Sequence, residues 1–372
     1  MFPTRRITTL GGDVYRDQYS LEFDGTDDYV EMGNASDLNV TTGDFTIMAW
    51  VYITGYIAGP RVILSKDSNI GGSNSGYGFT YEGSKARLIV EGATAQRATV
   101  GATTLVYNKW YHMVGTFDYD GAAYLYLNGV QDATSSTATG DINTTDPFRI
   151  GWDAVASRQL TGNISEASFW NIALSSSQVK QLYNGREPFD ARNVAKSNLK
   201  GYWRMGDGVL DHRQTNGLVA DQVTATLGSE LITAQADRDF SSASNWTNNN
   251  IASYDEDGDL SLTGVNGQWA FLTDTVLPLS TATVYKLTYT ATIASGTWKF
   301  QGYNNPHEIG AIVAGTANVL YFSNVEGAGG LRATCTGDGT IHLDDISVKE
   351  VNGNAGVLVN FDGTDFKTDV PR

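Results

Sequence analysis

Short stretches in which apolar and polar residues alternate recur along the chain, and turn-forming residues separate them. Residues 45–53 form the longest apolar run, with Trp50 near its middle, and residues 123–127 lead into Asn128-Gly129. A period of two is typical of half-buried strands, and Asn-Gly between two such runs indicates a two-residue hairpin. Strands at this spacing indicate a sandwich or jelly roll. We therefore expect an all-β fold of antiparallel sheets.

The length of 372 residues exceeds what one ordinary core holds, so we expect two β-sandwich or jelly-roll domains in tandem. One short helix is expected after the first, because Ser175 and Gln178 form a capping box and Gly185 follows the apolar stripe. The predicted organisation is an N-terminal arm (1–18), a first sandwich (19–187), a connector (188–229), a second sandwich (230–351) and a polar C-terminal tail (352–372).

Residues 23–27, which read Phe-Asp-Gly-Thr-Asp, recur in the tail as residues 361–365. Five residues of common turn type can match by coincidence, or they can be the remnant of a lost third repeat, and the sequence leaves both explanations open. Polar terminal arms seldom order alone, so the arm and the tail are expected to dock neighbouring subunits.

The charge and hydropathy of the chain exclude several classes of partner. Acidic residues number 41 and basic residues 25, which gives a formal net charge of −16, and the basic residues are not clustered. Nucleic acid is therefore not an expected partner. No apolar run reaches the roughly 18 residues of a membrane-spanning helix, so we expect no membrane insertion. Cys335 is the single cysteine and no hydrophobic signal core follows Met1, so synthesis in a reducing cytoplasm is expected.

Catalytic motifs are missing from the sequence, which contains neither Gly-x-Ser-x-Gly nor His-Glu-x-x-His. Glycoside hydrolases of the jelly-roll kind place carboxylates on alternate residues of one strand, so that they face the same cleft. Ser165-Glu166 offers a single acid instead. His112 and His342 lie within strand patterns, where structural roles are expected. We expect no enzymatic activity.

Five motifs follow one another in the first unit, at residues 21–30, 45–51, 110–114, 125–129 and 162–175. They read LEFDGTDDYV, FTIMAWV, WYHMV, LYLNG and GNISEASFWNIALS. In this order they resemble the laminin-G-like and pentraxin-like branch of the concanavalin A-like jelly rolls. The resemblance implies that fold for the first unit. It also implies binding of sugars or phosphorylated head groups through calcium at a rim of loops.

The same resemblance makes calcium a candidate cofactor. Calcium takes six to eight oxygen ligands, several of them carboxylates. Matched by position, Asp67 and Asn69 fall on the family's Asp-Asn pair after a core strand, and Asp153 falls in its acidic ligand loop. That loop is shorter here and lacks the family's run of acidic and amide residues. The alternative interpretation is that all three are solvated turn residues.

The second unit resembles the galactose-binding-like sandwiches of carbohydrate-binding modules, in Asn245-Trp246, residues 285–289 and the ending at residues 343–350. Flat aromatic rings suit the apolar face of a pyranose, and the alternative role for such rings is core packing, because aromatic residues dominate sandwich interiors. The candidate sugar contacts are Trp152, in a loop of the first unit, and Trp246, Trp269, Trp298 and Tyr303, which could line a concave face of the second.

The same ending, the connector segment 199–208 and the pairing of the two modules resemble structural proteins of bacteriophage particles. The resemblance implies a non-enzymatic virion component, made in the host cytoplasm and carried on a tail fibre, a tail appendage or the capsid surface. Its expected partners are other virion proteins, copies of itself and host surface glycans. The alternatives are a capsid decoration protein without sugar affinity, a secreted bacterial adhesin or carbohydrate-binding module, and a polysaccharide lyase.

Overall fold

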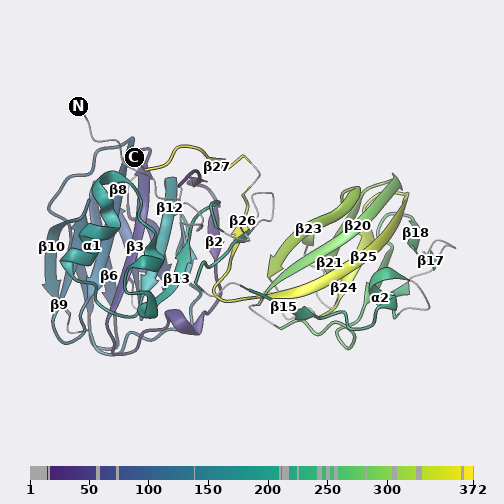
Figure 1. Ribbon diagram of the computed structural model, residues 1–372, viewed down its shortest axis with the longest axis horizontal. Helices are drawn as coiled ribbons and strands as arrows, with labels where there is room; N and C mark the ends of the chain where they lie inside the picture. Colours follow the sequence, from purple (N-terminus) through teal and green to yellow (C-terminus); the bar gives the residue numbers. More distant parts are fainter. Residues whose placement is uncertain are drawn as a thin grey trace, which may run out of the picture.

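The computed structural model places the chain in two antiparallel β-sandwiches, a larger one and a smaller one, joined by extended segments (Figure 1). The predicted all-β class is confirmed. None of the helices in the described part of the chain is long and apolar enough to span a bilayer. The structure describes residues 15, 17–55, 59–72, 75–137, 139–208, 211, 218–223, 226–240, 245–248, 252–254, 259–280, 283–303, 308–323, 329–361 and 364–371.

The first sheet of the larger sandwich is built around the long apolar run, which forms β3 (Phe45–Ile53). Its neighbours are β8 (Lys109–Phe117) and β12 (Thr161–Trp170), both antiparallel to it. The sheet continues with β9 (Ala122–Leu127) and β10 (Val130–Ser136) beyond β8, and with β1 (Ser20–Asp24), β13 (Leu199–Trp203) and β27 (Phe366–Lys367) beyond β12. The β9–β10 hairpin turns at Asn128 and Gly129, whose φ angles of 52° and 76° are those of the predicted Asn-Gly turn.

The second sheet of the larger sandwich packs against the first, and their facing side chains form one core. Phe45, Tyr77 and Phe169 stack within it, with ring centres 4.6 to 6.2 Å apart. The second sheet runs in the order β14 (Leu218–Val219), β26 (Gly356–Val359), β2 (Tyr29–Glu31), β11 (Arg149–Ile150), β4 (Arg61–Lys66), β5 (Gly76–Glu82), β6 (Lys85–Glu91) and β7 (Gln96–Val100).

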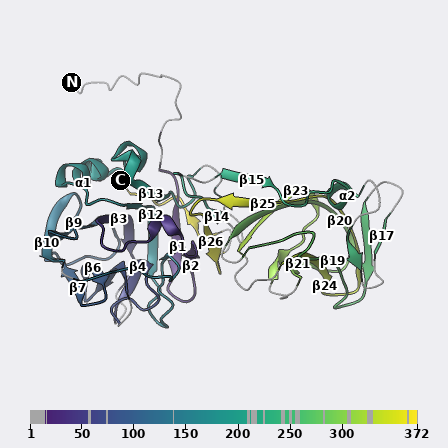
Figure 2. The same ribbon diagram turned by 90° about the horizontal axis from the view of Figure 1, so that it is seen from below.

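The predicted helix is present as α1 (Ser176–Tyr183), and Ser175 caps it in a capping box with Gln178. Val179 and Leu182 are its buried residues, and they pack on side chains from the outer face of the first sheet. Figure 2 shows α1 on the side of β3 and β12, away from β4, β6 and β7. The segment after α1 contains three 3-10 turns, η2 (Asn184–Arg186), η3 (Ala191–Asn193) and η4 (Lys196–Asn198). A further 3-10 turn, η1 (Ser36–Leu38), lies between β2 and β3.

The smaller sandwich also has two sheets, and the buried thiol of Cys335 lies in its core. One sheet contains β17 (Ala252–Tyr254), β18 (Leu260–Gly264), β25 (Gly339–Asn352), β20 (Val284–Ser295) and β23 (Gly315–Ser323), with β15 (Thr226–Glu230) paired to β25. The other contains β16 (Thr247–Asn248), β19 (Trp269–Leu272), β24 (Leu331–Cys335), β21 (Trp298–Gly302) and β22 (Glu308–Ala311). A short helix, α2 (Ala236–Asp239), contacts β25.

The chain returns to the larger sandwich after the smaller one, and here the structure differs from the predicted polar tail. Strand β26 pairs with β2 and β14, and β27 pairs with β1. The apolar residues of 356–361 explain the difference, because Leu358 and Phe361 are buried in the first core. The smaller sandwich is therefore an insertion within the larger one.

The two sandwiches share a small apolar contact at the points where the chain crosses between them. Leu218 and Val357 from the larger sandwich pack with Val284 and Tyr321 from the smaller one. The indole of Trp203 donates a hydrogen bond to the carbonyl of Asn354, with 2.7 Å between the atoms. These contacts tie the crossing segments to the larger sandwich.

Candidate functional site

The outer face of the five-stranded sheet in the smaller sandwich carries a row of aromatic and polar side chains. On β19, Ala270 is fully buried while Trp269 and Phe271 are half-buried, so the two rings point away from the core. Phe271 pairs in register with Arg332 of β24, and Arg332 pairs with Gln301 of β21. Residues in register across antiparallel strands share a face, so these side chains lie together on the outside of the sheet.

The contacts on this face fix the orientation of its groups. The guanidinium carbon of Arg332 lies 5.3 Å from the ring centre of Trp269, and its Nη2 donates to Gln301 Oε1 at 2.9 Å. Tyr303 stacks on Phe271, with 4.3 Å between ring centres and 15° between ring planes. We name the surface formed by Trp269, Phe271, Gln301, Tyr303 and Arg332 the aromatic platform.

The aromatic platform also keeps hydrogen-bonding capacity. Arg332 Nε and Thr334 Oγ1 are buried atoms without a hydrogen-bond partner among the described residues. Partial burial lowers the pKa of Arg332, yet a guanidinium stays charged at neutral pH. Flat rings beside a planar fork of donors suit a ligand that has an apolar face and hydroxyl groups at its edge.

Two of the four residues predicted to share this face do so, and two do not. Trp269 and Tyr303 belong to the aromatic platform. Trp246 and Trp298 are 5% and 2% exposed and lie in the core of the smaller sandwich, where their indole N–H groups donate to backbone carbonyls. Trp298 alternates with Lys299 along β21 and so points to the opposite face.

Sequence reasoning missed Phe271, Gln301 and Arg332. The alternation in residues 269–272 would have placed Phe271 beside Trp269, because residues two apart on a strand share a face. Arg332 and Gln301 come from two other strands, and only the register of the sheet brings them together.

Trp152, the aromatic candidate of the first unit, is packed against its own surroundings. Its indole N–H donates to the carbonyl of Val155 at 2.8 Å. Its ring centre lies 4.8 Å from that of Tyr29, and the guanidinium carbon of Arg149 lies 5.8 Å from it. Trp152 is half-buried and belongs to the larger sandwich, so it is not part of the aromatic platform.

The three predicted calcium ligands lie close together, and Arg158 lies among them. Arg158 Nη1 is 2.9 Å from Asp153 Oδ2, 3.3 Å from Asn69 Oδ1 and 2.8 Å from the carbonyl oxygen of Ile70. Asp67 Oδ1 accepts from the backbone N–H of Asn69 at 2.8 Å. The side chains of Asp67 and Asp153 are both fully buried.

These contacts do not fit a calcium ion as the residues stand. The guanidinium of Arg158 places a permanent positive charge on the same oxygens that calcium would need. Nearby, burial and the carboxylate of Asp67 raise the pKa of Glu91 to about 8, which favours its protonated form at neutral pH. Arg158 therefore occupies the position of a cation beside Asp153, and the calcium assignment stays a prediction.

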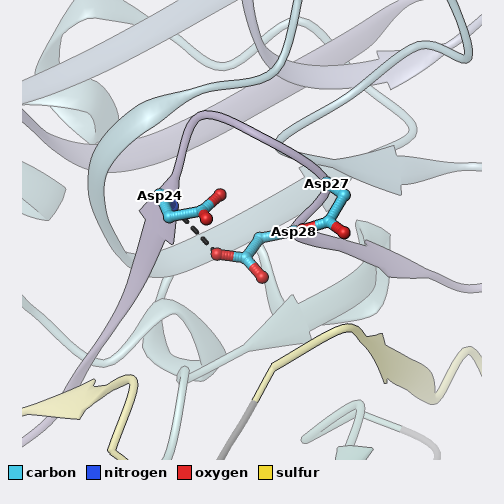
Figure 3. A group of neighbouring side chains, drawn as sticks. All are labelled: Asp24, Asp27 and Asp28. Atoms are coloured by element: carbon cyan, nitrogen blue, oxygen red, sulfur yellow. Dashed lines mark hydrogen bonds between the residues drawn. The ribbon is translucent and has the colours of Figure 1, made fainter.

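A second group of acidic residues lies in the turn between β1 and β2, within the family motif at residues 21–30. Carboxylate oxygens of Asp24, Asp27 and Asp28 lie within 4.8 Å of one another (Figure 3). The backbone N–H of Asp24 donates to Asp28 Oδ2 at 2.9 Å. Burial raises the pKa of Asp28 to about 7. The group could hold a cation, and exposed acidic turns of this kind are also common without one.

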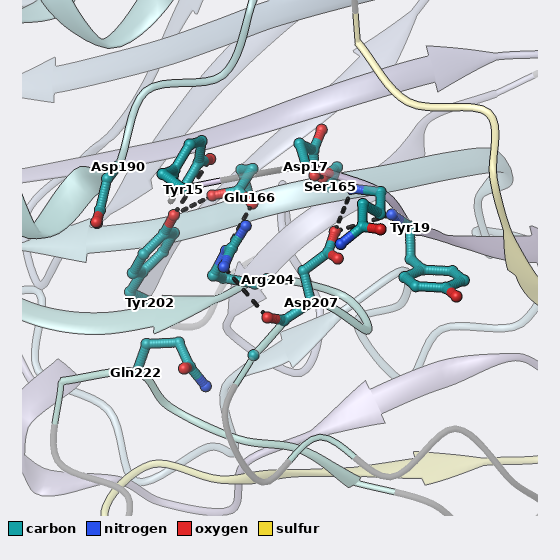
Figure 4. Close-up of polar contacts among 12 residues, drawn as sticks. Tyr15, Asp17, Tyr19, Ser165, Glu166, Asp190, Tyr202, Arg204, Asp207 and Gln222 are labelled. Carbon is teal, nitrogen blue, oxygen red and sulfur yellow. Dashed lines mark hydrogen bonds and ion pairs between the residues drawn. The ribbon is translucent and has the colours of Figure 1, made fainter. Parts of the chain in front are cut away.

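Glu166 of β12, the single acid considered in the sequence, lies in a buried polar network beneath the N-terminal segment (Figure 4). Its Oε1 accepts from Arg204 Nε at 3.1 Å, and its Oε2 accepts from the hydroxyl of Tyr202. Tyr15 covers the guanidinium of Arg204, with 4.5 Å between that carbon and the ring centre. Burial raises the pKa of Glu166, while Arg204 lowers it. The role of Glu166 that these contacts describe is structural.

The same network holds the chain just before β1. Asp207 Oδ2 accepts from the backbone N–H groups of Gln18 and Tyr19, at 2.6 and 2.8 Å. Asp17 Oδ1 accepts from the hydroxyl of Ser165 at 3.0 Å. Burial and the neighbouring Glu166 raise the pKa of Asp17 to about 9. The described end of the predicted arm is therefore bound to its own sandwich, whereas residues 1–14 lie outside the described part of the chain.

Comparison with known families agrees with the architecture of the larger sandwich. Residues 24–180 match the family model described as the concanavalin A-like lectin/glucanases superfamily. Together with the two facing antiparallel sheets, this match supports the concanavalin A-like jelly-roll fold predicted for the larger sandwich. A comparison with curated proteins gave no match.

Solved structures similar to this chain include a heptameric SAP-like pentraxin from Limulus polyphemus, at 16% identity and a TM-score of 0.36, covering 45% of this chain and 82% of that one. A Bacteroides ovatus protein, described as a candidate carbohydrate binding protein, shares 19% identity with a TM-score of 0.42, over 56% of each chain. Domain 4 of the Geobacillus stearothermophilus arabinanase AbnA, in complex with arabinotriose, shares 18% identity with a TM-score of 0.34, over 44% of this chain and 76% of that one.

Proposed function

We propose that this protein is a non-enzymatic glycan-binding protein that contacts sugars through the aromatic platform. The single observation that carries the proposal is the stack of Tyr303 on Phe271 beside the Trp269–Arg332 pair. Rings held rigid in this way lose little conformational entropy when a ligand binds, and Arg332 and Gln301 supply the directional hydrogen bonds. The concanavalin A-like lectin fold of the larger sandwich supports the same class of function.

We further propose that the protein is a component of a phage particle and contacts host surface polysaccharide. Its support is the resemblance of residues 199–208 and 343–350 to virion proteins. Weak affinity at one platform would be multiplied by many copies on one particle. Copies of the chain and other virion proteins are its proposed partners. The C-terminal strands are not proposed as docking arms, because they belong to the chain's own sandwich.

A glycan array probed with the intact protein tests sugar binding. We expect binding to at least one bacterial surface glycan, weakened by roughly tenfold or more in Trp269→Ala and in Phe271→Ala. The matched control is Val265→Ala, an exposed apolar residue of the same sandwich, which should bind like the parent. An array that stays blank would overturn sugar binding by the aromatic platform and favour a decoration protein.

The genes beside the coding sequence test the proposed context. Portal, capsid or tail genes alongside it support a virion component. Genes for polysaccharide degradation or for a secretion system in their place would favour an adhesin or the binding part of an enzyme.

A further inference from the structure

A pocket of about 460 Å³ opens on the outer face of the first sheet of the larger sandwich, at the end of α1. Trp50 and Tyr52 of β3 line it together with Trp110 of β8, and Tyr183 closes it from the helix. Trp50 and Tyr52 are two residues apart on one strand and therefore point to the same side of the sheet. The volume lies within the range of about 300–1,000 Å³ that is typical of small-molecule sites.

The walls of the pocket are aromatic rings in mutual contact. The rings of Trp50 and Tyr183 are stacked, with 5.8 Å between centres and 22° between planes. The rings of Tyr52 and Trp110 lie 5.6 Å apart at 53°. The hairpin residue Gly129 keeps the helix end close, since a Cβ there would lie 3.0 Å from Tyr183. The pocket is therefore a rigid aromatic slot.

Buried polar atoms beside this slot have no partner among the described residues. They are Trp50 Nε1 and both ring nitrogens of His112, whose ring centre lies 5.0 Å from that of Trp50. Trp50 is 2% exposed and His112 is fully buried. Native proteins leave few buried polar groups unsatisfied, and Trp50 lines the pocket, so its indole N–H is a donor that a polar ligand could satisfy, whereas His112 lies behind the lining residues.

The charged side chains that line the pocket are both positive, although the whole chain carries a net charge of −16. They are Lys109 and Arg186, accompanied by the amides of Asn108 and Asn128. One carboxylate contacts a lining residue, because the indole N–H of Trp110 donates to Asp369 Oδ1 at 3.4 Å. Paired cations favour an anion, and amides favour hydroxyl groups.

We infer that this pocket binds one carboxylate-bearing sugar residue, with the pyranose ring between the aromatic walls and the carboxylate toward Lys109 and Arg186. The inference takes its ligand class from the glycan-binding function proposed above, yet it concerns a different site on the other sandwich. The pocket would select acidic residues of a polysaccharide, while the aromatic platform would contact the chain of sugars more generally.

Titration of the full chain with methyl β-glucuronide and, as its uncharged counterpart, methyl β-glucoside tests this inference. We expect the glucuronide to bind roughly tenfold or more tightly, with a change in tryptophan fluorescence and a loss of affinity at high salt. Trp110→Ala should weaken binding of the glucuronide by roughly tenfold or more. Arg186→Gln should lower affinity for the glucuronide alone, and Asp369→Asn should raise it by removing a like charge.

Val100→Ala, an exposed residue on β7 in the other sheet of the same sandwich, is the matched control and should titrate with the glucuronide as the parent does. Each variant is first compared with the parent by its melting temperature, since Trp110 and Arg186 are not core residues. Equal affinity for the two sugars, unchanged binding in Trp110→Ala, or no binding of the glucuronide would overturn the inference. A blank glycan array with an intact glucuronide titration would instead overturn the platform alone.

Discussion

The ring of Phe361 lies edge-on against the ring of Phe23, with 5.2 Å between their centres and 83° between their planes. The two residues begin the two copies of the Phe-Asp-Gly-Thr-Asp motif at opposite ends of the chain. A backbone hydrogen bond of 2.8 Å from Glu22 to Asp365 continues the contact. Phe361 and Asp365 of the second copy thus contact β1, the strand that leads into the first copy.

Replacing Phe361 by Ala should destabilise the larger sandwich by about 3–5 kcal/mol, because it removes a fully buried ring from the core. Urea unfolding followed by near-ultraviolet circular dichroism measures the change. Lys367→Ala is the matched control in the same segment, since its ion pair with Glu22 is partly exposed and should contribute no more than about 1 kcal/mol. If Phe361→Ala lowers the free energy of unfolding by no more than the roughly 1 kcal/mol expected for Lys367→Ala, the C-terminal strands do not stabilise the core.

Replacing Arg158 by Gln should lower the free energy of unfolding by about 3–5 kcal/mol, because it leaves the buried carboxylate of Asp153 without its cation. In the parent we expect neither calcium nor a chelator to shift the melting temperature, since Arg158 already supplies the positive charge. In the variant, added calcium should restore part of the loss. Arg192→Gln, which breaks the more exposed pair with Asp190, is the control.

A parent protein that melts higher in calcium and lower with a chelator would contradict this expectation. The calcium site predicted at Asp67, Asn69 and Asp153 would then be correct, and Arg158 would have to move away when the ion binds.

Asp17 should make stability fall as pH rises. Its pKa in the folded protein is raised from 3.8 to about 9, so the folded state holds a proton that the unfolded state has lost between those values. The stabilisation is complete below about pH 4 and is lost as the pH approaches 9. Asp17→Asn should therefore gain melting temperature relative to the parent as the pH rises from 5 to 9. Asp120→Asn, an exposed turn residue, should show no such trend.

His112 should act in the opposite direction on the acid side. Burial lowers its pKa from 6.5 to about 3, so between these values the unfolded state binds the extra proton and stability falls as the pH falls. His112→Leu should flatten this part of the profile relative to the parent. His342→Leu in the smaller sandwich is the matched control. A parent-like slope in His112→Leu would show that other groups cause the loss.

Local patterns in the sequence were sufficient for the elements of this fold. Alternation predicted the strands, the capping box of Ser175 and Gln178 predicted the helix start, and Asn128-Gly129 predicted the hairpin. These signals act between residues a few positions apart, so they can be interpreted without knowledge of the rest of the chain. The order of five such motifs also indicated the concanavalin A-like family that the comparison found.

Only the tertiary structure decided which face of each strand became the core and which distant groups met. Alternation separates Trp269 from Ala270, but it does not say that Trp269 lies outside while Trp298 lies inside. The guanidinium of Arg158 meets Asn69 across two loops, and Phe361 meets Phe23 across nearly the whole sequence. Contacts between residues so far apart in the sequence depend on strand register and on the packing of complete sheets, and the residues around each position do not determine either.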